Sequence, residues 1–124
     1  MMTETHKVMH DDSIGISATC VRVPVYVGHS EALHIEFSRP MSPDNVREVL
    51  ATAPGVKVLD DPTVSLYPHA WMAAGQDEVF VGRIRQDISH PNGIAMWVVS
   101  DNLRKGAALN AVQIVETMME RNWF

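Results

Sequence analysis

Apolar and polar residues alternate along several stretches of the chain, which is the pattern of half-buried β-strands. Together with runs of β-branched residues, this pattern predicts five strands, at residues 16–27, 32–37, 56–59, 78–87 and 94–99. In the second stretch, Leu33, Ile35 and Phe37 share one side. In the fourth, strict alternation places Val81 and Ile84 on opposite faces. The intervening Pro91-Asn92-Gly93 turn joins the last two strands as a hairpin.

Helical spacing appears in three other segments. Residues 2–10 form a first helix with Val8 and Met9 on its apolar side. A second helix begins with Ser42 as N-cap and Pro43 in its first turn. A third covers residues 103–119, after the N-cap candidates Ser100, Asp101 and Asn102. Its apolar face comprises Ala108, Ala111, Val112, Val115, Met118 and Met119.

Residues 60–77 lie between the short third strand and the hairpin. Their apolar residues show neither strand nor helix spacing, and the segment contains two prolines and a glycine. They are predicted to form a long loop, and loops of this length in small domains are often functional. The order of elements predicts an α+β fold, in which helices pack on one face of a mixed sheet.

Composition narrows the class of protein without defining it. The 124 residues amount to one domain or less, and the net charge of −5 argues against a nucleic-acid partner. No apolar run approaches the roughly 20 residues of a membrane span, and the first residues lack an apolar signal core. The single cysteine, Cys20, cannot form an internal disulfide. We therefore expect a cytoplasmic protein without a membrane or nucleic-acid partner.

Two side chains stand out as candidates for chemistry. Arg22 interrupts an apolar strand, and its planar guanidinium is suited to grip a carboxylate through two parallel hydrogen bonds. His29 follows the glycine that ends that strand, where a histidine could carry protons near neutral pH. The structural alternatives are an ion pair of Arg22 within the sheet and a loop histidine bonded to the backbone.

Two other patterns suggest chemistry that we do not expect. Cys20 lies nine residues before His29, but it alternates with Ile16 and Ala18 on the predicted strand and is interpreted as a small buried hydrophobe. His29 and His34 resemble a zinc motif with one residue too many, and an odd spacing on a strand points the two rings to opposite faces. No metal site is expected.

Long strings of this sequence resemble bacterial aspartate-semialdehyde dehydrogenases. The first is residues 17–25, Ser-Ala-Thr-Cys-Val-Arg-Val-Pro-Val, followed by Gly28-His29-Ser30. The others are Val-Gly-Arg-Ile-Arg at 81–85 and the block from Trp97 to Ile114. The resemblance covers nearly the whole chain. It implies the dimerisation-domain fold of that family, in which a broad sheet packs across a two-fold axis in a homodimer.

The resemblance also implies a reaction. The family reduces L-aspartyl 4-phosphate to L-aspartate 4-semialdehyde and phosphate with NADPH, in the biosynthesis of lysine (through diaminopimelate), threonine and methionine. In that family the arginine at the position of Arg22 holds the substrate α-carboxylate, and the histidine at the position of His29 is the acid/base. The helix start at Asn102 and Gly106 lies near the nicotinamide. From the residues alone, close packing of the helix against the sheet is the preferred explanation of this glycine.

Three family features lie upstream of the matching region: the Gly-rich dinucleotide fingerprint, the nucleophilic cysteine and a phosphate-contacting lysine. This chain contains no G-x-G-x-x-G. We therefore expect residues 1–124 to be the carboxy-terminal part of the enzyme, with a terminal helix that packs on the NADP-binding domain, and to be inactive alone. The alternatives are a non-catalytic dimerisation or regulatory module and a small-dicarboxylate-binding protein that uses Arg22.

Overall fold

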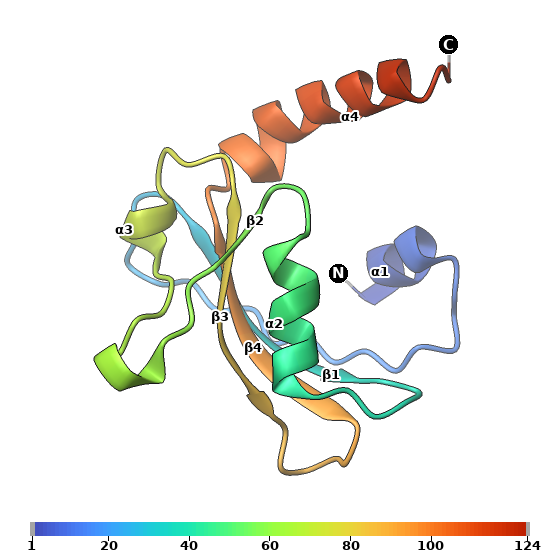
Figure 1. The fold of residues 1–124 in the computed structure, drawn as a ribbon. Coiled ribbons are helices and arrows are strands. Elements are labelled where there is room, and N and C mark those ends of the chain that lie inside the picture. Colours follow the sequence, from blue (N-terminus) through green and yellow to red (C-terminus); the bar gives the residue numbers. More distant parts are fainter. Residues whose placement is uncertain (1, 124) are drawn as a thin grey trace.

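The computed structural model describes residues 2–123 and contains a four-stranded mixed sheet (Figure 1). The strands lie in the order β1 (His29–Glu36), β4 (Gly93–Ser100), β3 (Val79–Gln86) and β2 (Val56–Val58). β4 is antiparallel to both of its neighbours, whereas β2 runs parallel to β3. The predicted α+β class with a mixed sheet is confirmed, as are four of the five predicted strands.

The helices differ in how much of their surface the sheet covers. α2 (Pro43–Ala51) lies across one face of the sheet, and Ser42 caps it by accepting a hydrogen bond from the Asn45 N–H, as predicted. α1 (Met2–Met9) and α4 (Leu109–Glu120) extend away from the sheet and have no buried residues (Figure 1). No helix within residues 2–123 is long and apolar enough to cross a membrane.

Each face of the sheet carries its own apolar cluster. Beneath α2, the buried residues are Val46, Val81, Ile84, Ile94 and Met96, and Leu33, Ile35 and Phe37 pack against them. The second cluster, on the opposite face, contains Phe80 and Val99 together with Ala73 of the short helix α3 (Ala70–Ala73). The Trp97 indole N–H donates to the Pro68 carbonyl at 3.1 Å on that face. The predicted loop 60–77 therefore contains two helical turns, η1 (Pro62–Val64) and α3, and covers part of the second face.

A β-bulge interrupts the strict alternation that was predicted for β3. The pairing of β3 with β4 shifts between Gly82 and Arg85, and Arg83 adopts a left-handed backbone with φ 52°. Because a bulge adds one residue to its strand, the side chains beyond it change face. Val81 and Ile84 consequently lie in the same cluster, where strict alternation had separated them.

The strand predicted at residues 16–27 is wrong. This segment forms no strand, and its β-branched side chains are largely exposed, with Val21 at 75%. β-propensity reflects packing against neighbouring strands, and no strand within residues 2–123 pairs with this segment. The expected burial of Cys20 fails for the same reason, since its side chain is exposed.

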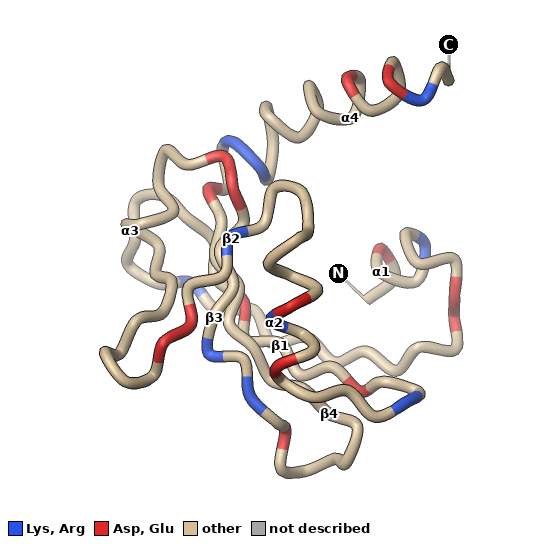
Figure 2. The backbone as a smooth tube through the Cα atoms, viewed as in Figure 1, with Lys and Arg blue, Asp and Glu red and all other residues tan. Residues whose placement is uncertain are grey.

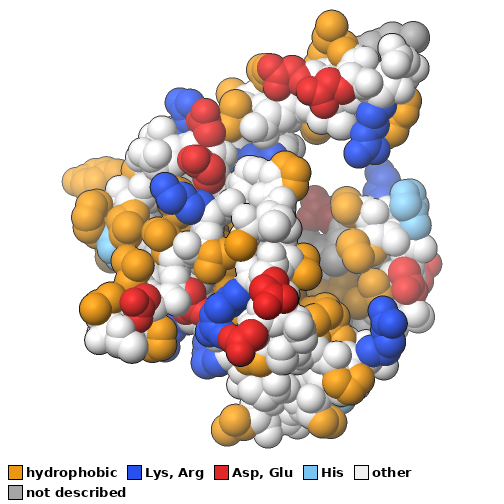
Figure 3. Space-filling model, in the orientation of Figure 1, with side chains coloured by type: hydrophobic (Ala, Val, Ile, Leu, Met, Phe, Trp, Pro, Cys, Tyr) orange, Lys and Arg blue, Asp and Glu red, His pale blue; other side chains and the backbone are white. Residues whose placement is uncertain are grey.

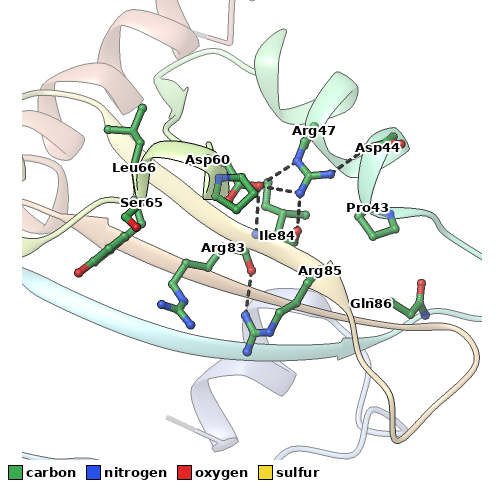
Figure 4. A pocket seen from close by; sticks show the side chains of 12 residues that line it. Pro43, Asp44, Arg47, Asp60, Ser65, Leu66, Arg83, Ile84, Arg85 and Gln86 are labelled. Carbon is green, nitrogen blue, oxygen red and sulfur yellow. Dashed lines mark hydrogen bonds and ion pairs between the residues drawn. The ribbon is translucent and has the colours of Figure 1, made fainter.

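Side chains take the place of a strand along part of the outer edge of β3. β2 pairs with β3 only over Val79–Val81. Beyond it, the Ile84 N–H donates to Asp60 Oδ2 at 3.3 Å, and Arg47 Nη2 donates to the Ile84 carbonyl at 2.5 Å (Figure 4). Arg47 and Asp60 also bond to each other at 2.8 Å, and only 6% of the Asp60 side chain is exposed. This ion pair joins α2 to the bulged strand.

Candidate functional site

Two segments that are far apart in the sequence meet beside His29. His29 is the first residue of β1 and lies opposite Ser100, the last residue of β4. Immediately before it, the Gly28 N–H donates to Asn102 Oδ1 at 2.8 Å. Two residues that the sequence singled out independently, His29 and Asn102, are thus brought to one end of the sheet. We refer to Gly28, His29 and Asn102 as the His29 corner.

His29 is paired with a carboxylate and remains open to solvent. Its Nε2 lies 3.0 Å from Glu31 Oε1, and 60% of the histidine side chain is exposed. Residues i and i+2 of a strand share a face, so the strand geometry places the Glu31 side chain beside that of His29. A carboxylate on one ring nitrogen orients the imidazole and leaves the other nitrogen available for proton transfer. Glu31 is not among the residues predicted for the site, although its spacing of two from His29 in a strand is a usable signal.

The backbone of the His29 corner requires glycine at position 28. Gly28 has φ +108°, a conformation that side chains rarely adopt. A Cβ atom there would lie 2.9 Å from the Cβ of Ala70, in α3. The close approach of α3 and the hydrogen bond to Asn102 therefore depend on the same residue.

Gly28→Ala is expected to lower the free energy of unfolding by about 1–3 kcal/mol, because it combines backbone strain with a clash. Urea unfolding monitored by circular dichroism measures the loss. Gly55→Ala is the matched control: Gly55 also has positive φ, 71°, but a Cβ there would meet nothing within 4 Å. A loss for Gly28→Ala no larger than that for Gly55→Ala would contradict the proposed close contact.

Asp101 holds the start of the terminal helical segment in place. It is 3% exposed and accepts hydrogen bonds from the Gly75 N–H at 2.7 Å and from the Leu103 N–H at 2.7 Å. These bonds, first of all the one from Gly75, hold the pKa of Asp101 below its usual range against the opposing effect of burial. The carboxylate therefore links the long loop to the residues that follow Asn102. Asp101 was one of three N-cap candidates; it accepts from the Leu103 and Arg104 N–H groups, although the helical segment itself has Leu103 in its N-cap position.

Gly106 lies in a π-helical turn, Arg104–Ala108, that precedes α4. A Cβ at Gly106 would meet only Asn102 Cβ at 3.7 Å and Asp101 O at 3.8 Å, which are ordinary contacts. Close packing within residues 2–123 therefore does not explain this glycine. Single π-turns inserted in α-helices are frequent at functional sites, and both Asn102 and Gly106 are exposed.

Arg22 takes no part in the hydrogen bonds that define the His29 corner. Arg22 is exposed in the extended segment before β1, and it forms no ion pair among the described residues. The alternative of an ion pair within the sheet is therefore not observed in this part of the chain. Its guanidinium faces solvent.

His34 lies on the opposite side of β1 from His29, as their odd spacing predicts. Its Nδ1 lies 2.7 Å from Asp87 Oδ2, and Ser89 also donates to Asp87. These bonds, chiefly the one with His34, hold the pKa of Asp87 well below its usual range. Within residues 2–123, no group of three or more metal-ligating side chains comes together.

Comparisons with known proteins agree with this fold. The family model described as "Semialdehyde dehydrogenase, dimerisation domain" matches residues 1–105. The chain is 56% identical to the aspartate-semialdehyde dehydrogenase of Aquifex aeolicus and 57% identical to that of Legionella pneumophila, covering 97% and 95% of this chain but 35% and 34% of theirs. It also superposes on a crystal structure of aspartate semialdehyde dehydrogenase II from Vibrio cholerae, complexed with ASA. That match has a TM-score of 0.91 and 46% identity, and covers 100% of this chain and 36% of the other.

The chain thus spans about a third of the length of the relatives that it matches. The similarity extends over both the sheet and the terminal helix, and it confirms the resemblance that the sequence strings indicated. This protein belongs to the semialdehyde dehydrogenase dimerisation-domain family.

Proposed function

We propose that this chain is the carboxy-terminal part of an NADP-dependent aspartate-semialdehyde dehydrogenase, which converts L-aspartyl 4-phosphate and NADPH to L-aspartate 4-semialdehyde and phosphate. The observation that carries the proposal is the His29 corner, where a histidine–carboxylate pair lies beside Asn102 at the end of the sheet. The names of the relatives supply the reaction class.

His29 is the acid/base in this proposal. It takes the proton of a cysteine thiol contributed from outside this chain, and the thiolate then attacks the acyl phosphate as phosphate leaves. This attack leaves a thioester on the cysteine. Once hydride has reduced the thioester, the protonated imidazole would return the proton to the oxyanion at that carbon, and cleavage of the C–S bond would release the aldehyde and the thiol. Glu31 acts as a positioning residue, because its carboxylate orients the ring and stabilises the imidazolium while it holds the proton.

Arg22 binds the substrate α-carboxylate in this proposal. Its guanidinium is exposed and is not engaged by a carboxylate among the described residues, so its donors remain available for a bidentate grip. The substrate is then held at one end by Arg22 and reacts at the other end beside His29.

NADP supplies hydride when it is bound, and this chain contributes Asn102 and Gly106 to its site. Both residues are exposed, and a Cβ at Gly106 would make only ordinary contacts, the nearest with Asn102 Cβ at 3.7 Å. A flat ring can approach the backbone closely at such a position. Asn102 Oδ1 is already bonded to Gly28, so its amide nitrogen is the group left for the cofactor.

Association with further protein surface belongs to the same proposal. The matching family is described as a dimerisation domain, and we infer that this chain assembles as a homodimer. The apolar face of α4 is exposed, with Val112 at 54% and Met119 at 63%, and hydrophobic side chains are visible along it in Figure 3. We infer that the NADP-binding domain covers this face.

The proposal is tested with a fusion protein in which this chain replaces the corresponding third of the Legionella pneumophila relative. We expect the fusion protein to oxidise NADPH with aspartyl phosphate, and the 124-residue chain alone to show no turnover. Arg22→Ala in the fusion protein should raise KM through the lost carboxylate contact, by about 10- to 100-fold. Turnover by the isolated chain that Cys20→Ser abolishes would overturn the proposal, as would a folded fusion protein without activity.

A further inference from the structure

A cleft with a volume of about 640 Å³ lies along the outer edge of β3, beyond the end of β2. Tyr67 and Pro43 lie on its walls, and three arginines line it: Arg47, Arg83 and Arg85. Figure 4 shows Arg83 and Arg85 extending from the same side of β3, whereas Arg47 lies with Asp60 on the other side. The lining residues belong to α2, the long loop and the bulged strand, so the fold brings them together from distant parts of the sequence.

The three arginines differ in what they bind. Each of the three guanidinium nitrogens of Arg47 donates a hydrogen bond, to Asp60, to Asp44 and to the Ile84 carbonyl. Neither Arg83 nor Arg85 forms an ion pair with any carboxylate within residues 2–123. Figure 2 shows blue positions along the lower part of β3, the strand that contains both arginines. The protein as a whole is acidic, with a net charge of −5, so two neighbouring arginines without an ion-pair partner form a local region of positive charge.

The backbone positions these two side chains. Arg83 occupies the left-handed region at φ 52°, which is unfavourable for any residue other than glycine and is found preferentially at functional sites. Its guanidinium lies 5.7 Å from the centre of the Tyr67 ring, where a cation–π contact restrains it. Arg85 Nη1 donates to the Arg83 carbonyl at 2.8 Å, which leaves four of its five donors available.

The hydrogen bonds along the outer edge of β3 argue against a peptide as the ligand of this cleft. A peptide that adds to a sheet edge needs free backbone N–H and C=O groups. Here the Ile84 N–H is bonded to Asp60, the Ile84 carbonyl to Arg47 and the Arg83 carbonyl to Arg85. What the cleft offers is therefore side-chain donors rather than a free backbone.

From these observations we infer that the cleft binds a small dianion, with one acidic group on Arg83 and one on Arg85. Planar guanidinium groups recognise both phosphate and carboxylate oxygens through paired hydrogen bonds. Two of them side by side on one strand match a ligand whose acidic groups are separated by a few bonds. Inorganic pyrophosphate and succinate represent the phosphate and carboxylate forms of that chemistry.

The test is a titration of this chain with pyrophosphate at constant ionic strength, followed by the backbone amide shifts of residues 82–86 in NMR spectra. We expect saturable shifts with a Kd of about 1 mM or tighter. Arg85→Ala should weaken binding about 10-fold, through the loss of charge-assisted hydrogen bonds. A parallel titration with succinate shows which acidic group is preferred.

Arg83→Gly is the sharper variant, because glycine accepts φ 52° without strain and the chain should remain folded. We expect it to weaken pyrophosphate binding as much as Arg85→Ala does. Arg39→Ala is the matched control, since Arg39 is an exposed arginine outside the cleft lining. Absence of saturation with both probes would overturn the inference, as would unchanged affinity in Arg83→Gly or Arg85→Ala, or an equal loss in Arg39→Ala.

Discussion

In the fusion protein, His29→Gln is expected to lower kcat by about 10²- to 10⁴-fold with little change in KM. Glutamine retains a polar side chain of similar reach, but it cannot accept the thiol proton or return it to an oxyanion. The Glu31 carboxylate beside His29 would then have no imidazolium to stabilise. Initial rates of NADPH oxidation over a range of aspartyl phosphate concentrations separate kcat from KM.

His34→Gln is the matched control for this experiment. His34 belongs to the same strand, is similarly exposed at 62%, and also pairs with a carboxylate, Asp87. It lies on the other face of β1, away from Asn102. An equal fall in kcat for His34→Gln would mean that β1 itself is perturbed, and the assignment of His29 as the acid/base would fail.

Asp60→Ala is expected to lower the free energy of unfolding by about 2–4 kcal/mol, because the Ile84 N–H and the Arg47 guanidinium both lose a buried carboxylate acceptor. The Arg47 side chain, 33% exposed, retains its contact with Asp44. The Ile84 N–H would lose its acceptor at the edge of β3. Urea unfolding of the isolated chain measures the difference.

Asp44→Ala serves as the comparison, because Asp44 binds the same guanidinium but its side chain is 86% exposed. Exposed pairs contribute little, and we expect a loss of less than about 1 kcal/mol. If the two variants were equally destabilised, burial of Asp60 would not be the reason for its effect, and the account of this edge would need revision.

Elements whose signals are local could be predicted from the sequence. The cap at Ser42 with Pro43 defines the start of α2, and the Pro91-Asn92-Gly93 turn defines the hairpin of β3 and β4. The bulge was not predicted, although Gly82, a lone glycine inside the strand pattern, is a signal for one. The left-handed backbone of Arg83 itself has no sequence signal. The strand expected at residues 16–27 failed because strand formation depends on a partner as well as on propensity.

Some features of the candidate site could be predicted from the sequence, and others could not. His29 and Arg22 were singled out as the end and the interior of a strand at 16–27 that does not form, since Gly28 directly precedes β1. The specific roles of His29, Arg22, Asn102 and Gly106 came from the family resemblance. The contact of Gly28 with Asn102 joins residues 74 positions apart, so no local pattern reveals it. Glu31 could have been found, because strand residues two apart share a face.

The Arg47–Asp60 pair also bears on how copies of this chain can associate through their sheets. On that side the sheet ends in the three-residue strand β2, which carries Lys57, and then in backbone groups that the ion pair already occupies. Short, charged and occupied edges resist the addition of strands from other molecules. On the other side of the sheet, β1 is the last strand, and no strand within residues 2–123 pairs with its outer edge. A sheet that can grow from one edge only forms a closed pair rather than an open fibre.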